Sequence, residues 1–392
     1  MNNYRVLFCL RVLKNVLTIF LDSFLVLYFL NVSNSNILPI GIYKLIAIIT
    51  IYIVIFATRN LCKSKHRVNL MRIGIMLDLV YFITIIALRE NVVNYVYIIG
   101  LLYGLEEGFY YSVYNMLETD GVKNKERAKY LGSYTATQSI IAILFPALFG
   151  GLIYATGFIE ATLVAVGIVV IQIALSFMFK DKNVPKSNKT NFKVFKRLIK
   201  DNAIIKDVYK NKFCAALLYS EAAFAYIVTI YIIRVFSDSI SLGIFTSVFS
   251  LISCALGILF VKIIKPRDYT ALMKISTIFV VISLCAMIWN CNMATIIIFN
   301  LCNTIFKGLS DLINSRNAGN IANLKAIQRE YKVEYFLGIE TMLVIARTIS
   351  HSLFIIMAVT GQMNIIYIFA VFLILYAVST INLQNKAEQE AS

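Results

Sequence analysis

The sequence predicts an all-α polytopic membrane protein with twelve transmembrane helices, arranged as two pseudo-symmetric six-helix bundles. Hydrophobic residues make up 59% of the 392 residues and charged residues 15%, against about 25% charged residues in soluble domains. Apolar runs of about 20 residues recur along the chain, each long enough to cross a hydrocarbon core of about 30 Å. Lys and Arg outnumber Asp and Glu, 37 to 21, and gather in every second loop. These observations exclude a soluble enzyme, a disordered chain and a secreted disulfide scaffold.

The apolar runs define the spans and the loop charges orient them. We expect helices at 9–30, 37–56, 71–88, 95–117, 131–155, 158–179, 213–235, 241–263, 271–289, 293–314, 336–359 and 363–383. The turns after odd-numbered spans hold one basic residue, Arg89, whereas the opposite loops and the two termini hold 32 of the 37. By the positive-inside rule, that face and both termini are cytoplasmic. The net charge of +16 is therefore interpreted as a topology signal that also attracts anionic headgroups, and we expect no nucleic-acid partner.

The span pattern divides the chain into three parts. We predict an N-terminal six-helix bundle at 1–179, a basic cytoplasmic loop at 180–212, and a C-terminal bundle with a short tail at 213–392. In the loop, 191–200 places apolar residues on one helical stripe and basic residues around it, which favours an amphipathic helix in the headgroup layer; a solvated linker is the alternative. Residues 130–135 are similar to 336–341, an offset of about 206 residues that supports a duplicated six-helix unit.

Several motifs with a chemical function are missing from the sequence. The seven cysteines have no metal-ligand spacing, and no G-x-x-x-x-G-K-[ST] loop is present. We also find no nucleophile and base together within the spans. We therefore expect no enzyme, no cofactor and no metal, and a monomer that depends on a proton gradient for energy. The first apolar run contains Asp22 and no small-residue cleavage site precedes Asn31, so we expect it to remain as the first span.

Ionisable residues inside the predicted spans are the candidate functional residues, because a charge at the bilayer centre costs at least about 2.5 kcal/mol. The candidates are Asp22, Glu106, Glu107, Glu221, Lys307, Asp311, Glu340 and Arg347. Most lie in spans one, four, seven and ten, which would therefore line a shared cavity. Asp78 in span three is an exception that would face a neighbouring helix or pair with the basic loop at 59–72, and Lys44 would extend outward.

The fourth span carries two adjacent carboxylates, Glu106 and Glu107, one turn from Tyr103 and Tyr110. Two neighbouring carboxylates in a low dielectric do not both ionise readily, so we expect one to hold a proton near neutral pH. The alternative is that tyrosine hydroxyls and Lys44 or Arg347 satisfy both acids.

Three glycines also recur along the fourth span. Gly100, Gly104 and Gly108 repeat at four-residue spacing, which predicts the close approach of another helix backbone. The stripe is interpreted mainly as a packing surface.

In the second half, Lys307 and Asp311 stand at i and i+4, where they would neutralise each other. Glu340, Arg347 and His351 share one face of span eleven. Arg347 would bridge helices or bind an anionic group, and His351 is interpreted as a packed or hydrogen-bonded residue.

Over its full length the chain resembles the major facilitator superfamily, with six plus six spans and a central cytoplasmic loop. The family's loop signature between spans two and three, roughly G-x-x-x-D-R-x-G-R-R, is matched only in basic character, and the resemblance implies Lys63, Lys65 and Arg67 as gating-loop candidates. In span five, residues 146–151 are similar to the G-P-x-x-G-G element of exporters, and a packing kink is the alternative.

The sequence thus predicts a secondary active transporter of a bacterial cytoplasmic membrane that moves a small solute by alternating access. We hypothesise proton coupling through Glu106 and Glu107, assisted by Asp22 and Glu221, and efflux of a drug or lipophilic cation. The alternatives are a transporter of a small anionic or sugar-like solute that uses Arg347 and Lys307, or a non-transporting membrane sensor or assembly partner.

Overall fold

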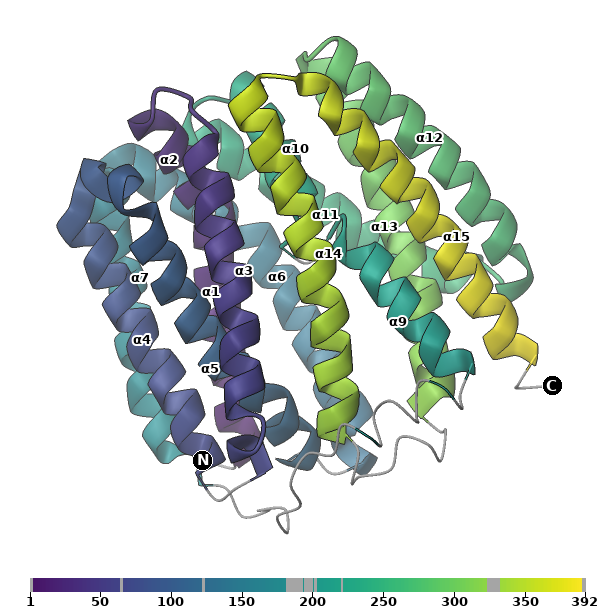
Figure 1. Cartoon of the computed structure of the whole chain (residues 1–392), viewed down its shortest axis with the longest axis horizontal. Helices are drawn as coiled ribbons and strands as arrows, with labels where there is room; N and C mark the ends of the chain where they lie inside the picture. The colour runs from purple at the N-terminus through teal and green to yellow at the C-terminus, as the bar shows by residue number, and fades with distance from the viewer. Residues whose placement is uncertain are drawn as a thin grey trace. The chain divides into compact units, whose positions relative to one another are not determined.

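The chain is helical throughout the part that its structure, a computed structural model, describes (Figure 1). The described residues are 3–63, 66–121, 124–180, 193, 200, 203–219, 221–322 and 332–389. They group into two compact units, residues 1–190 with 236–247 and residues 191–235 with 248–392.

The first unit contains the helices of the first six spans. In chain order they are α1 (Asn3–Phe20), the π-helical turn η1 (Leu21–Leu25), α2 (Val26–Val32), α3 (Leu38–Thr58), η2 (Leu61–Lys63), α4 (Arg67–Leu88), η3 (Arg89–Tyr95), α5 (Val96–Gly121), α6 (Asn124–Thr156) and α7 (Phe158–Met178). The first turns of α11 (Ser239–Ile263) also belong to this unit.

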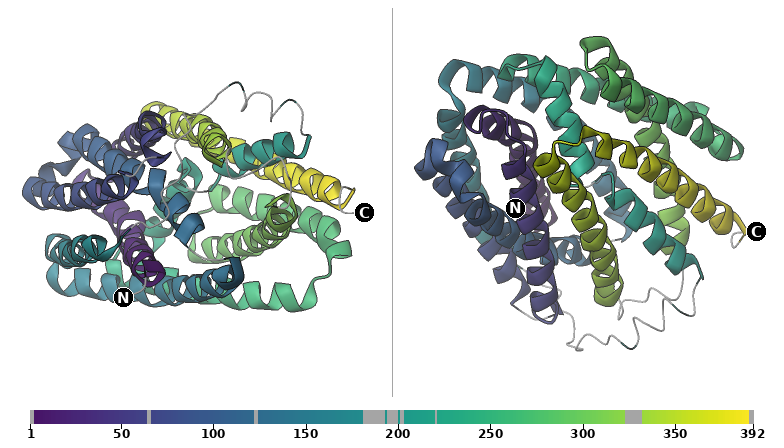
Figure 2. Two further views of the ribbon diagram at one scale, coloured as in Figure 1. Left: turned by 90° about the horizontal axis from the view of Figure 1, so that it is seen from below. Right: turned by 45° about the horizontal axis from the view of Figure 1, so that its top comes forward.

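The second unit contains the rest of α11 and the remaining helices. These are α9 (Ala203–Ala216), α10 (Ala223–Val235), η4 (Pro266–Asp268), α12 (Tyr269–Trp289), α13 (Met293–Ala322), α14 (Lys332–Thr360), η6 (Met363–Ile366) and α15 (Tyr367–Gln389). Helix α9 packs against α14 and α15, as the views in Figure 2 also show. In the first unit, α1 packs against α6 and α7 in the same way, which is the relation expected of a duplicated six-helix plan.

The helices confirm the twelve predicted spans. Ten helical stretches among the described residues are long and apolar enough to cross a membrane. One of them, Arg67–Glu118, contains both α4 and α5, and the shorter apolar helix α10 with α9 completes the set. The protein is therefore a multi-pass membrane protein. The amphipathic helix expected at 191–200 lies outside the described residues except for Lys193 and Lys200.

The seventh predicted span, 213–235, is wrong as a continuous helix. Helix α9 ends at Ala216 and α10 begins at Ala223, and between them Glu221 has a positive φ of 70°. A left-handed residue cannot continue a right-handed helix. Glu221 interrupts the apolar segment at the break, but one acid within 23 residues leaves the average hydropathy of the segment high.

Glycines bring three helices of the first unit close together. A Cβ atom at Gly104 would lie 2.6 Å from the carbonyl oxygen of Ala47 on α3, and one at Gly100 would lie 2.5 Å from the carbonyl oxygen of Tyr43. On α4, a Cβ atom at Gly74 would lie 2.9 Å from the carbonyl oxygen of Glu106 on α5. Helix α5 is thus held tightly between α3 and α4, which confirms the packing interpretation of the glycine stripe.

The proline element of the fifth span also serves close packing. Pro146 lies inside α6, and the next backbone amide, that of Ala147, donates a hydrogen bond of 3.1 Å to Ser247 Oγ on α11. Ser239 Oγ donates to the carbonyl oxygen of Gly150 at 3.0 Å. The element thus joins α6 to the first turns of α11 in the same unit.

Candidate functional site

A buried ionic cluster lies at the centre of the first unit. Its cation is Lys14 on α1, whose Nζ lies 2.7 Å from Glu106 Oε2, 3.1 Å from Asp78 Oδ2 and 3.2 Å from Glu107 Oε1. The four side chains are at most 6% exposed. Tyr110 is buried beside them, with its ring centroid 5.8 Å from Lys14 Nζ. Three carboxylates from two helices therefore share one ammonium group.

Close helix packing positions this cluster. Asp78 follows Gly74 by one turn of α4, and Gly74 lies against the backbone of α5 at Glu106 and Tyr110. Since nothing larger than glycine fits there, the carboxylates of α4 and α5 are brought to the same ammonium. On its opposite face α5 is held against α3 by the glycine stripe.

The charges of the cluster do not balance. One ammonium and three ionised carboxylates sum to a formal charge of −2, and burying uncompensated charge costs several kcal/mol per ion. Asp78 Oδ1, Glu106 Oε1 and the hydroxyl of Tyr110 are buried and have no hydrogen-bond partner within the described part of the chain. The arrangement therefore has both the charge and the open acceptor positions to take up protons.

Lys14 is the member of the cluster that the sequence prediction places wrongly. It was counted among the cytoplasmic basic residues, and the partners expected for Glu106 and Glu107 were tyrosine hydroxyls, Lys44 or Arg347. The structure buries Lys14 against both acids and against Asp78. The signal was available, because the predicted first span, 9–30, already included position 14.

A second ion pair of the first unit involves Asp22 and Lys44. Asp22 lies in the π-helical turn η1, and its Oδ1 is 3.7 Å from Lys44 Nζ on α3. The Asp22 side chain is 41% exposed, whereas that of Lys44 is 3% exposed. The expectation that Lys44 extends outward is wrong, because its Nζ lies 4.4 Å from the ring centroid of Tyr103. Asp22 is therefore the accessible partner of this ion pair. It also lies in a π-helical turn, and such turns are frequent at functional sites.

The break between α9 and α10 is bridged by α14. Ser350 Oγ donates a hydrogen bond to the carbonyl oxygen of Leu217 at 3.0 Å and accepts one from the amide of Ala223 at 3.1 Å. His351 Nε2 lies 2.9 Å from the carbonyl oxygen of Glu221. These contacts satisfy backbone groups that the broken helix leaves open, and they confirm the expectation that His351 is a hydrogen-bonded residue.

The other predicted site residues of the second unit form two groups near this break. Glu340 interacts electrostatically with Arg347 and Glu221, and Arg347 Nε is buried without a hydrogen-bond partner among the described residues. Asp311 interacts with Lys307, whose Nζ lies 5.5 Å from the ring centroid of Tyr219. The structure thus brings Glu221, Glu340 and Arg347 together, and Lys307 with Asp311.

The loop between α3 and α4 is only partly described. Two of the gating-loop candidates, Lys65 and the side chain of Lys63, lie outside the described part of the chain. Arg67, the third gating-loop candidate, lies at the start of α4 and is 1% exposed. Cys62 Sγ donates to the carbonyl oxygen of Ser112 on α5 at 3.4 Å, which ties this loop to α5.

Within the described ranges, no three or more His, Cys, Asp and Glu side chains are grouped to hold a metal ion.

Comparisons with known proteins agree with the fold. Residues 63–320 match the family profile described as Major Facilitator Superfamily. A bacterial homologue of the iron transporter ferroportin has a similar structure, with 12% identity, a TM-score of 0.68 and coverage of 97% of this chain and 98% of the other. A nucleoside transporter has 11% identity and a TM-score of 0.70 over 97% and 100% of the chains. The human organic anion transporter has 12% identity and a TM-score of 0.64 over 97% and 99%. No curated protein matches the sequence.

Proposed function

The chain belongs to the major facilitator superfamily, and on that premise we propose that it is a proton-coupled secondary active transporter of a cytoplasmic membrane. The observation that carries the proposal is the Lys14 cluster, in which one buried ammonium faces three buried carboxylates. Neighbours of similar fold move iron, nucleosides or organic anions, so the fold alone favours no substrate.

The cluster would couple protons to conformation through the cost of burying charge. While it is closed from water, its excess negative charge is unfavourable, and protons on the carboxylates remove that charge. When α1, α4 and α5 separate enough to admit water, hydration stabilises the ionised carboxylates and a proton leaves. Glu106 and Asp78 are the carboxylates best placed to carry it, because in each one oxygen contacts Lys14 and the other has no hydrogen-bond partner among the described residues.

We further propose a lipophilic cation as the exported substrate, with Asp22 as its first contact. The Asp22 side chain is 41% exposed, and its Oδ1 lies 3.7 Å from Lys44 Nζ. An accessible carboxylate would attract a cationic ligand. The similarity of residues 146–151 to the exporter element supports export.

One observation favours a second candidate function. Arg347 Nε is buried and lacks a hydrogen-bond partner within the described residues, and a guanidinium is suited to a carboxylate or another oxygen-rich group. A small anionic or sugar-like solute is therefore the alternative substrate.

Proton occupancy can be tested without a known substrate. Infrared spectra of the purified protein near neutral pH are expected to show a protonated carboxyl band, which Glu106→Gln or Asp78→Asn weakens. The matched control is Asp268→Asn, an acid that is 48% exposed and is expected to leave the band unchanged. A wild-type spectrum without the band would refute the proton site.

Coupling can be tested in proteoliposomes under an imposed pH gradient. Tetraphenylphosphonium and ethidium serve as cation probes, and p-aminohippurate and glucose as probes of the second candidate. We expect a cation-dependent change of luminal pH that Glu106→Gln abolishes and Asp268→Asn retains. Movement of p-aminohippurate or glucose alone, lost in Arg347→Gln, would replace the cation by the second candidate. Probe transport that is unaffected by Glu106→Gln would refute the coupling role.

A further inference from the structure

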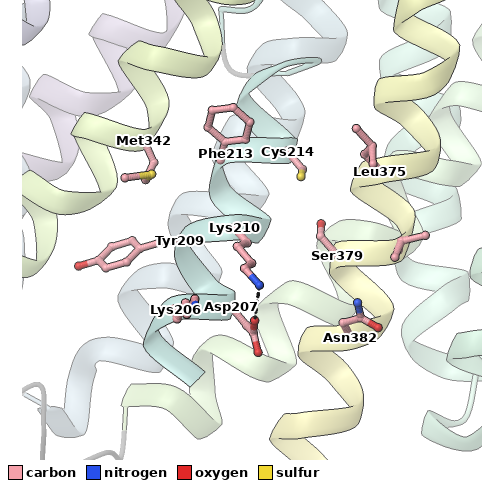
Figure 3. A pocket seen from close by; sticks show the side chains of 11 residues that line it. Lys206, Asp207, Tyr209, Lys210, Phe213, Cys214, Met342, Leu375, Ser379 and Asn382 are labelled. Carbon is pink, nitrogen blue, oxygen red and sulfur yellow. Dashed lines mark ion pairs between the residues drawn. The ribbon is translucent and has the colours of Figure 1, made fainter. Parts of the chain in front are cut away.

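The second unit has a groove between α9, α14 and α15 that the proposed transport does not use. Its volume is about 430 Å³. Figure 3 shows its walls, with α9 in the middle, Met342 of α14 on one side and residues of α15 on the other. The apolar part of the lining is formed by Phe213, Cys214, Met342, Leu375 and Val378.

One end of this groove is basic. Lys206 and Lys210, one turn apart on α9, line it together with Asp207. The Asp207 carboxylate forms an ion pair with Lys386 of α15 and lies 3.7 Å from Lys210 Nζ. Three lysines thus accompany one carboxylate, which leaves a net charge of +2, and the Lys210 side chain is 63% exposed.

The apolar walls are open to the surroundings. Leu375 and Val378 on α15 are about half exposed, 46% and 49%. In a multi-pass membrane protein, such an exposed apolar face contacts acyl chains. From Lys206 to Phe213 the axis of α9 rises about 10 Å, so the basic end and the apolar walls lie within the length of one lipid.

We propose that this groove binds an anionic phospholipid, with its phosphate at Lys206 and Lys210 and an acyl chain along Phe213, Leu375 and Val378. The charge complementarity carries the assignment. The basic end belongs to the start of α9, and Lys206 and Lys210 are two of the eleven basic residues in the predicted loop at 180–212. Loops of this kind face the leaflet that is rich in anionic lipids.

A tryptophan reporter tests the proposal. The chain has one tryptophan, Trp289, so Trp289→Phe with Leu375→Trp places a single fluorophore in the groove. We expect brominated phosphatidylglycerol to quench it at a lower mole fraction than brominated phosphatidylcholine. Lys206→Gln with Lys210→Gln is expected to lower that preference roughly 25-fold, since each lysine contributes about fivefold. Val378→Trp is a second reporter if Leu375→Trp does not fold.

The matched control removes two other exposed lysines of the second unit. Lys262→Gln with Lys265→Gln is expected to keep the preference. An equal loss in both lysine pairs would show general surface attraction and refute the site. Equal quenching by the two lipids, or displacement of the lipid by millimolar inorganic phosphate, would refute it as well, because a free phosphate cannot replace the contacts of an acyl chain.

Discussion

Replacing Lys14 by methionine removes the only cation in contact with Asp78, Glu106 and Glu107 among the described residues. Methionine is also unbranched and fills irregular space well, so Lys14→Met changes charge more than shape. The ammonium lies 2.7, 3.1 and 3.2 Å from the three carboxylates. At an effective dielectric constant of about 20, each of these contacts corresponds to about 5–6 kcal/mol of attraction. The variant therefore cannot keep the same carboxylates ionised.

The cost of additional protons sets the expected magnitude. Protonating one carboxyl of ordinary pKa at pH 7 costs about 4 kcal/mol, so one extra proton lowers the free energy of unfolding by about 4 kcal/mol. This value falls within the range of about 3–5 kcal/mol that is typical when one partner of a buried ion pair is removed.

Chemical unfolding of the purified protein in detergent measures this loss and its pH dependence. The folded variant binds a proton that the unfolded chain lacks above about pH 5, so its stability relative to wild type rises by about 1.4 kcal/mol for each unit that pH falls. Between about pH 7.5 and about pH 5.5 it should regain about 3 kcal/mol. Adding Glu106→Gln should restore part of the loss at neutral pH, and the exposed control Lys274→Met should lose little.

A loss below about 1 kcal/mol would refute this reasoning, because it would mean that the buried carboxylates have little need of the ammonium. A loss of the same size at both pH values would refute it too.

Three further predictions concern packing and backbone satisfaction. Gly104→Val should destabilise the protein by about 1–3 kcal/mol, because its Cβ would overlap α3. The control Gly167→Ala should be neutral or stabilising, because a Cβ there meets nothing within 4 Å. Equal shifts of the thermal unfolding midpoint in the two variants would contradict this. Ser350→Ala should lower the free energy of unfolding by about 2 kcal/mol, because two backbone groups at the helix break lose their partner; an unchanged midpoint in a denaturant titration would contradict it. Hydrogen bonding from Ser241 at the start of α11 lowers the pKa of Asp238. The ionised form is therefore favoured in the folded state, and this stabilisation is present near neutral pH and lost below about pH 4. Asp238→Ala should cost about 1 kcal/mol at neutral pH and less in acid; a constant difference would contradict the cap.

The spans could be predicted from the sequence because hydropathy and loop charge are properties of whole segments. The same averaging conceals single residues. Glu221 interrupts the apolar run at 213–235, but a single acid does not by itself predict a break in the helix. The hydrogen bonds that allow the break come from Ser350 and His351, far along the chain.

The acidic part of the first cluster could also be predicted, since Glu106 and Glu107 are conspicuous in an apolar run. Their partner could not be predicted with the same ease. Lys14 lies near the start of the chain, which is rich in basic residues, so a count of loop charges includes it with Arg5 and Arg11. Its burial depends on contacts with carboxylates of α4 and α5 that only the folded unit brings together, and segment hydropathy does not describe such contacts.

The Ser350 bridge across the break between α9 and α10 can form only after most of the second unit has been synthesised. Helix α10 spans only about 20 Å, less than a hydrocarbon core of about 30 Å, so it needs α9 and the intervening turn to cross the membrane. The hydroxyl that satisfies this turn lies 133 residues after Leu217 and 127 residues after Ala223. At about 5–20 residues per second, the ribosome takes on the order of 10 s to make that stretch. During this interval the seventh span lies in the membrane without its Ser350 bridge, so the backbone groups of Leu217 and Ala223 need another hydrogen-bond partner.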